Sequence, residues 1–219
     1  MKRYEIKFKI QIKDQYIFLN WLYNNFFFIE SYNPRLVNSI YFDTSDYYFA
    51  SSNMSGQSKR SKVRVRWYNE NTKIKNLEIK NKINNLSDKI AFQLDSSSFL
   101  KNINFFNDLR IKVNSIISSN KKINFSYLRE VVFIKYKRKY FELKNNKDIR
   151  ITIDENLQYS SIYEINNKIL LAKDFFIVEF KFSPIFYEKV QLILDKFPFR
   201  SSRNSKYLYA ISQIKQVLY

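Results

Sequence analysis

The chain has 219 residues, with 38 Lys and Arg against 20 Asp and Glu, and a formal net charge of +18. It contains no Cys and no His, which excludes disulfides, thiol catalysis, Cys-ligated zinc and histidine general bases. Such an excess of positive charge indicates an anionic partner: polyphosphate, nucleic acid or a membrane surface. Hydrophobic residues make up 45% of the chain, which predicts a folded protein, and we expect residues 1–219 to form a single domain.

The first half of the chain is predicted to consist mainly of strands. Strands are expected over residues 4–13, 37–43, 62–68 and 76–82, and charged and apolar side chains alternate in the first, third and fourth of these, as in half-buried strands. A helix is expected to begin after Asp14, its N-cap, and to run through about residue 30, over QYIFLNWLYNNFFFIE. The stretch around Gly56, the only glycine, is expected to be a loop.

The second half is predicted to combine strands with three helical regions. Strands are expected at 131–144, 150–154 and 176–182, with a short one beginning at Leu170. Residues 95–118 are expected to form one or two helices with a Ser-rich start at 96–98, and single helices are expected at 184–197 after Pro184 and at 206–218 after Ser205. Short strands with alternating faces favour an antiparallel sheet or barrel over a doubly wound parallel sheet.

Five of these strands carry their charges on one face. The faces are Glu5/Lys7/Lys9, Lys62/Arg64/Arg66, Glu78/Lys80/Lys82, Arg150/Thr152/Asp154 and Glu179/Lys181. Each face could simply meet water, as half-buried strands usually do. Arginines in strands, with isolated carboxylates among the cations, instead favour a site for phosphate and a divalent cation. If the charged faces point inward, the sheet forms a basic tunnel, and helices such as the aromatic one after Asp14 must cover its apolar outside.

Eight motifs resemble, in order, those of a known family. From about Arg3 to Tyr207, RYEIKFKI, SIYFDTSD, KVRVRWY, LEIKNK, YKRKYF, RITID, VEFKF and SKY resemble the VTC domain of polyphosphate polymerases, in the triphosphate tunnel metalloenzyme (CYTH-like) superfamily. The resemblance implies an α+β fold, an eight-stranded antiparallel β-barrel tunnel with covering helices. It also implies transfer of the ATP γ-phosphate to a growing polyphosphate chain, with Mn²⁺ or Mg²⁺.

The resemblance implies roles for individual residues. Catalytic roles are implied for Lys7, Arg64, Arg66, Lys80, Arg138, Arg150, Lys181, Ser205 and Lys206. Binding of ATP is implied for Lys7, Arg64, Arg66, Lys80, Arg138 and Lys206, and metal binding for Glu179, Glu5 and Glu78. By residue type alone, Lys7 could be a solvated lysine, Glu78 a structural ion-pair partner and Ser205 only a helix cap.

Some positions depart from the family pattern or stay outside the predicted site. Arg3 stands where the hydrolase branch has the first carboxylate of E-x-E-x-K, which argues against a simple triphosphatase. Lys9, Lys62 and Lys82 are expected at the tunnel rim or on the surface, and residues 41–43 are expected to be structural. The segment SDKIAF offers Lys89 but lacks the fuller Lys/Arg pattern expected there.

Other functions remain open. The same tunnel could hydrolyse triphosphate or nucleoside triphosphates, or bind polyphosphate as a non-catalytic sensor. Nucleic-acid binding is disfavoured because the cations alternate along strands rather than lying on a helix or arm. The sequence shows no signal peptide and no run of 18 apolar residues, so we expect a cytoplasmic protein. Export of the product would require a separate membrane protein as partner.

Overall fold

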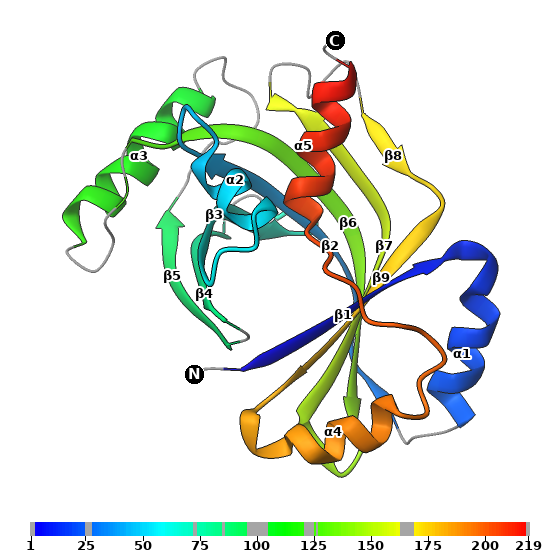
Figure 1. Cartoon of the computed structure of the whole chain (residues 1–219). Helices are drawn as coiled ribbons and strands as arrows, with labels where there is room; N and C mark the ends of the chain where they lie inside the picture. The colour runs from blue at the N-terminus through cyan, green and yellow to red at the C-terminus, as the bar shows by residue number, and fades with distance from the viewer. Residues whose placement is uncertain are drawn as a thin grey trace.

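The computed structural model describes residues 3–24, 28–71, 74–84, 86–95, 105–120, 125, 127–162 and 169–217. Within these ranges, strands form one curled sheet with helices around it (Figure 1). The strands are β1 (Tyr4–Gln11), β2 (Phe28–Asp43), β3 (Lys59–Tyr68), β4 (Ile74–Ile83), β5 (Leu86–Asp95), β6 (Arg129–Leu143), β7 (Asn146–Ser161), β8 (Leu170–Ala172) and β9 (Phe175–Phe182). The α-helices are α1 (Gln15–Asn24), α2 (Tyr48–Met54), α3 (Phe105–Ser119), α4 (Tyr187–Leu194) and α5 (Lys206–Val217).

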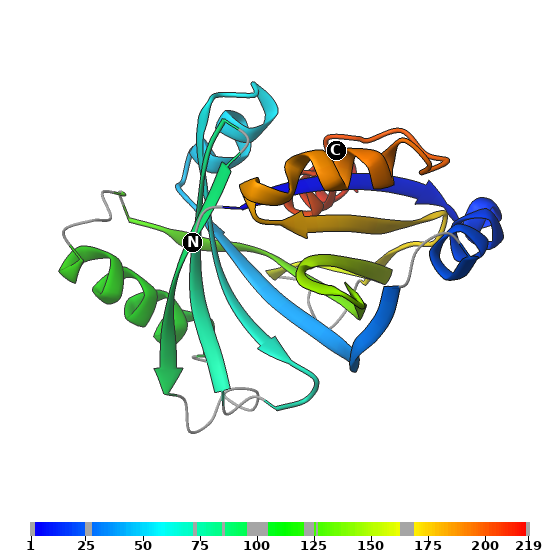
Figure 2. The same cartoon turned by 90° about the horizontal axis from the view of Figure 1, so that it is seen from below.

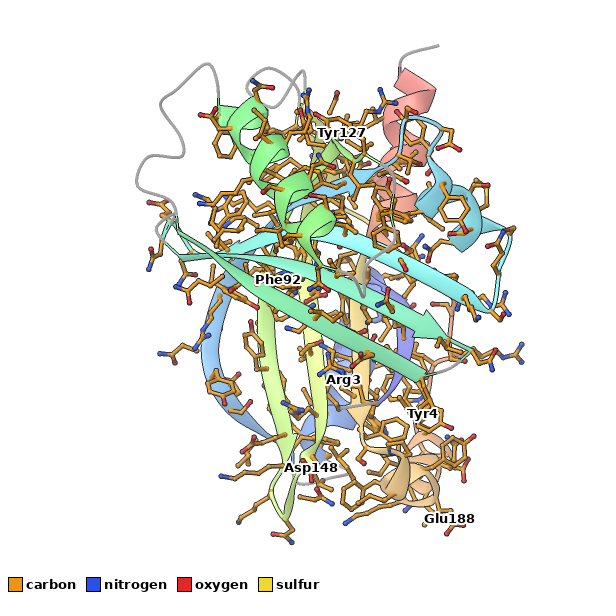
Figure 3. The ribbon with its side chains drawn as sticks, turned by 90° about the vertical axis from the view of Figure 1, so that its left-hand side faces the viewer. Arg3, Tyr4, Phe92, Tyr127, Asp148 and Glu188 are labelled. Atoms are coloured by element: carbon orange, nitrogen blue, oxygen red, sulfur yellow. The ribbon has the colours of Figure 1, made fainter. Side chains whose placement is uncertain are left out.

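The sheet confirms the predicted antiparallel tunnel fold, with one strand more than expected. Eight strands follow the order β1-β9-β7-β6-β2-β3-β4-β5, and β8 pairs only with β7. The edge strands β1 and β5 meet at the bridge between Arg3 and Ser87, where the Ser87 N–H donates to the Arg3 carbonyl oxygen at 3.3 Å. Figure 3 shows Arg3 beside β5. Among the residues that the structure describes, the curled sheet is therefore closed by a single bridge rather than by a continuous ladder.

Helices cover the apolar outer face, as the sequence analysis expected. Over β1, β7 and β9, α1 and α4 bury a cluster that includes Phe8, Phe18, Trp21, Leu22, Val178, Phe180, Val190 and Ile193. Over β3 and β4, α3 buries Val63, Val65 and Trp67 against Leu109, Val113 and Ile117. Figure 2 shows α1 and α3 on opposite sides of the curled sheet. With the apolar side chains packed outside, the charged ones are left to face inward.

Two predicted elements were wrong in part. The helix expected through residue 30 ends at Asn24, and residues 28–30 already belong to β2, where Phe28 pairs with Leu143 of β6. The helix expected over 95–118 spans Phe105–Ser119, its expected start at 96–98 lies outside the described residues, and β5 ends at Asp95. An apolar run is compatible with a buried helix or with a strand. At residues 28–30 the pairing with β6 determines that the run is a strand.

One part of the inner face is apolar and is covered by α5. There, Ile134, Leu157, Tyr159 and Ile177 pack against Tyr207 and Ala210 of this helix, in a cluster with Val37 and Tyr41. The helix thus fills one end of the curled sheet and brings its first residues to the charged part. None of the described helices has the length and hydropathy needed to cross a bilayer.

Candidate functional site

The charged inner face lines a cavity of about 1390 Å³. All the residues to which the sequence analysis gave a catalytic, ATP-binding or metal-binding role line it. They are Glu5, Lys7, Arg64, Arg66, Glu78, Lys80, Arg138, Arg150, Glu179, Lys181, Ser205 and Lys206. Strand alternation brings the strand residues together, because every second residue of a strand points to the same side, and the start of α5 supplies Ser205 and Lys206.

Lysines and two carboxylates meet where β1 lies against β9. Lys7 pairs with Glu179 in the ladder and Glu5 with Lys181. The Glu179 carboxylate lies 3.4 Å from Lys7 Nζ and 3.1 Å from Lys181 Nζ, and Glu5 accepts a hydrogen bond from Lys80 Nζ. Burial opposes ionisation of Glu179, but the lysine charges outweigh it and hold the pKa of this carboxyl well below its usual value. Both carboxylates are therefore held ionised by cations.

A third carboxylate, that of Glu78, lies among arginines on β3 and β4. Glu78 is 2.7 Å from Arg64 Nη2 and 3.5 Å from Arg66 Nη1, and Lys89 Nζ donates to it at 3.0 Å. Burial is the largest single effect and disfavours its charge, but Arg64, Arg66 and Lys89 together outweigh burial and hold the pKa of the Glu78 carboxyl well below its usual value. Arg64 also donates to the Tyr41 hydroxyl at 3.0 Å. The contacts of Glu78 are thus those of an ion-pair partner. Tyr41, which was expected to be structural, lines the cavity beside Arg64.

Asp154 was not among the predicted site residues, yet it holds two of the predicted cations. The Arg138 guanidinium donates to both of its carboxylate oxygens, at 2.6 and 2.8 Å, and Lys206 Nζ lies 2.5 Å away. Asp154 is 2% exposed, so this pairing is shielded from water. Its position on the same strand face as Arg150 and Thr152 was the signal that could have identified it.

Lys62 lies deeper than the predicted rim position. Its Nζ donates to Ser205 Oγ at 2.6 Å, and it lines the cavity. Burial and the neighbouring charges of Lys7 and Lys80 lower the pKa of Lys62 well below its ordinary value. The Leu208 N–H also reaches Ser205 Oγ, at 3.4 Å, so Ser205 both caps α5 and faces the cavity. Lys9 is exposed and Lys82 half-buried at the cavity wall, in agreement with a rim position.

The cations of the cavity repel one another and lose hydration. Burial lowers the pKa of Lys181 to about 7, although Glu179 opposes the shift, and lowers the pKa of Lys80 to about 8. A polyanion that enters the cavity stabilises the charged form of such lysines, so binding of the anion is favourable. The arrangement is therefore suited to binding a chain of negative charges.

The three predicted metal ligands do not gather in one place. Within the described ranges, no group of three Asp or Glu side chains is arranged to hold a metal ion. Glu5 and Glu179 lie close enough for each charge to oppose the ionisation of the other, whereas Glu78 is enclosed by Arg64 and Lys89. Two carboxylates beside a basic cavity still fit Mg²⁺ or Mn²⁺, since such ions usually take one or two carboxylates together with phosphate oxygens of a substrate.

Comparison with protein families identifies the chain. The family model of the VTC domain matches residues 2–215. The chain belongs to the VTC domain family. The family predicted from the sequence motifs is therefore confirmed. The match covers nearly the whole chain, including the short motifs that supply the cavity residues.

Solved structures show that this VTC domain protein has a triphosphate tunnel fold. The Hippeastrum protein HpAC1, described as having a dominant triphosphatase activity, has a TM-score of 0.60 at 15% identity, covering 98% of this chain and 97% of its own. A Vibrio parahaemolyticus protein described as a candidate adenylate cyclase has a TM-score of 0.55 at 12% identity, with coverages of 95% and 98%. The PH1819 protein of Pyrococcus horikoshii OT3 has a TM-score of 0.52 at 14% identity, with coverages of 96% and 99%. At these identities the likeness shows the fold alone, and a comparison with curated proteins found none similar in sequence.

Proposed function

We propose that this VTC domain protein is a polyphosphate polymerase, a phosphotransferase that moves the γ-phosphate of ATP onto a growing polyphosphate chain. The supporting observation is the unbroken row of cations along the inner face of β3, namely Arg60, Lys62, Arg64 and Arg66. At about 3.3 Å per residue this row covers about 20 Å, which is longer than one triphosphate group. A channel that only hydrolysed triphosphate would have no need for cations over such a length.

Phosphoryl transfer demands positioning and charge neutralisation more than covalent catalysis. Arg64 and Arg66 of β3 and Arg138 of β6, the two strands that flank β2, would hold the phosphates, with Asp154 fixing Arg138 in place. The proposed nucleophile is the terminal phosphate of the chain or orthophosphate. It is already anionic, so the reaction needs no histidine base.

Glu179 and Glu5 would hold the divalent cation. Both face the cavity beside Lys7, where a phosphate could supply further oxygen ligands. When bound, Mg²⁺ or Mn²⁺ would neutralise phosphate charge and fix the geometry of the phosphoryl group. The lysines that surround Glu179 would then contact phosphate oxygens instead of this carboxylate.

Residues 1–219 would act as a single catalytic domain, because every strand of the described part belongs to one sheet. A separate membrane protein remains the proposed partner for export of the product. The second candidate function is hydrolysis of triphosphate, supported by the fold shared with HpAC1. Arg3 counts against it, because this position lies at the β1–β5 bridge and carries no carboxylate.

Incubation with ATP and Mn²⁺ tests the proposal. A polymerase yields an acid-stable chain of many phosphates, a hydrolase yields orthophosphate alone, and a sensor binds polyphosphate without consuming ATP. The Arg64→Met/Arg66→Met variant should lose turnover. The Lys189→Met variant changes an exposed lysine of α4 that does not line the cavity, so it should match the wild type.

A further inference from the structure

The two ends of the cavity differ in chemistry. Along the inner face of β3 the lining residues run from Arg60 through cations to Tyr68. Near Arg60 the wall is basic, because Lys82 and Arg203 also line the cavity there. Burial lowers the pKa of Lys82 most, and the charges of Arg60 and Arg203 lower it further. At the other end, Tyr68 is joined by Tyr32 and Tyr140 as lining residues. The cavity therefore has a basic mouth and a tyrosine mouth.

At the tyrosine mouth two rings form an open corner. Tyr32 of β2 pairs with Tyr140 of β6, and their ring centroids are 5.8 Å apart at an interplanar angle of 85°. Tyr32 is 58% exposed although its ring lines the cavity. Perpendicular rings leave a corner in which a third planar group can lie flat on one ring and turn its edge to the other.

Arg35 lies at the same corner. Its guanidinium carbon is 5.4 Å from the Tyr32 ring centroid and 5.9 Å from that of Tyr140, and its side chain is exposed. An exposed guanidinium plane over aromatic rings can stack on a nucleobase as well. Two tyrosines and an arginine thus offer flat surfaces where the phosphate-binding cations end.

The spacing along β6 connects this corner to the phosphate site. Tyr140 follows Arg138 by two residues, so both side chains point inward about 6.6 Å apart along the strand. On β3 Tyr68 follows Arg66 in the same way. β3 and β6 both pair antiparallel with β2, so they run in the same direction and end their inner rows at the same mouth. A separation of this size suits the ribose between a base and its first phosphate.

We propose that the corner formed by Tyr32, Tyr140 and Arg35 binds the base of the nucleoside triphosphate, with the phosphates directed toward Arg138 and Arg66. This inference rests on the proposed function only in taking a nucleoside triphosphate as the phosphate donor. Stacking tolerates every base, because each has a π-face, so the site should distinguish nucleotide from inorganic tripolyphosphate more than adenine from guanine.

Equilibrium binding of β,γ-imido-ATP and of tripolyphosphate tests the site without turnover. In the Tyr32→Ala/Tyr140→Leu variant the nucleotide analogue should bind about 10-fold to 100-fold more weakly, the loss expected for base stacking on aromatic side chains. Tripolyphosphate should bind within about 2-fold of the wild type. Tyr140→Phe keeps the ring and should bind both ligands as the wild type does, and so should Tyr16→Ala, which removes a 75% exposed ring outside the cavity.

Saturation-transfer NMR adds a readout that a merely structural role would not produce. Saturation of the protein should reach the adenine H2 and H8 protons in the wild type and fail to reach them in the double variant. An equal loss of both ligands, or unchanged nucleotide binding, overturns the site. A wild type that binds tripolyphosphate but no nucleotide also refutes it while leaving the phosphate channel intact, whereas a wild type that binds neither ligand refutes the proposed function itself.

Discussion

Lys7 and Glu179 lie directly opposite each other on β1 and β9, with Lys7 Nζ 3.4 Å from Glu179 Oε1. In the same carboxylate the other oxygen lies 3.1 Å from Lys181 Nζ. Both Lys7 and Lys181 line the cavity, so one side chain holds two cations at the position proposed for a metal. A carboxylate in this place can exchange its lysine partners for a divalent ion when phosphates arrive to pair with the lysines.

The first prediction concerns Glu179→Gln. The amide keeps the shape of the carboxylate but supplies no negative charge for a divalent ion, so we expect metal-dependent turnover of ATP to fall at least about 100-fold. The measurement is turnover across a Mn²⁺ titration, with circular dichroism as the check on folding. Full activity of this variant would refute the metal role of Glu179.

The second prediction concerns stabilisation by tripolyphosphate. A ligand that binds only the folded state at 100 times its dissociation constant stabilises by about 2.7 kcal/mol, which for a chain of this size corresponds to about 5–10 °C in melting temperature. We expect such a rise at millimolar tripolyphosphate, and a smaller one at 0.5 M salt because exposed charges are screened. An unchanged melting temperature would contradict a basic channel.

The third prediction concerns protons taken up on binding. Lys181 has a pKa of about 7 in the folded protein against 10.5 ordinarily, so between these values the unfolded chain binds more protons and the free energy of unfolding rises with pH. Lys80, with a pKa of about 8, acts in the same direction. A bound polyanion restores the charge of both lysines, so tripolyphosphate should bind with proton uptake at pH 8.

Calorimetry in two buffers of different ionisation enthalpy measures that uptake. Lys181→Met should reduce the number of protons taken up, whereas Lys189→Met on exposed α4 should leave it unchanged. Binding without proton uptake would show that the channel lysines are already charged, and the same uptake in both variants would show that Lys181 does not contribute to it.

The fourth prediction concerns Asp154→Asn. The substitution leaves Arg138 and Lys206 as buried cations without their carboxylate, and breaking a buried pair in this way costs about 3–5 kcal/mol. We expect lower stability in urea and, at a temperature where the variant stays folded, reduced turnover through misplaced Arg138. Thr152→Ala, on the same strand face, serves as the comparison. A stable and fully active Asn variant would rule out this positioning role for Asp154.

The fifth prediction separates the outer cover from the channel. Trp21 of α1 packs with its ring centroid 4.6 Å from that of Phe197 and 6.0 Å from that of Phe180. Trp21→Ala should cost about 3–5 kcal/mol of unfolding free energy in urea denaturation, whereas Tyr16→Ala on the exposed side of α1 should cost less than about 0.5 kcal/mol. Below the unfolding transition, tripolyphosphate should bind both variants equally. Weaker binding to the folded Trp21 variant would mean that the cover shapes the channel.

Which strand faces carry charge follows from the amino-acid sequence alone. Alternation in KVRVRWY and VEFKF separates cations from apolar residues, whatever the strands pair with, because successive side chains point to opposite sides. Family motifs in the right order then identified the tunnel fold and the residues that line the cavity. These features are local in the chain, so they can be read without the tertiary structure.

Which side chains meet one another depends on how the strands and helices pack in three dimensions. Asp154 lies against Lys206, Lys62 binds Ser205, and residues 28–30 form a strand where a helix was predicted. All three depend on contacts between segments far apart in the chain. The corner of Tyr32 and Tyr140 depends likewise on the register of β2 against β6. Register and helix docking arise from packing over the whole molecule, and a pattern that repeats every two residues does not specify its partner strand.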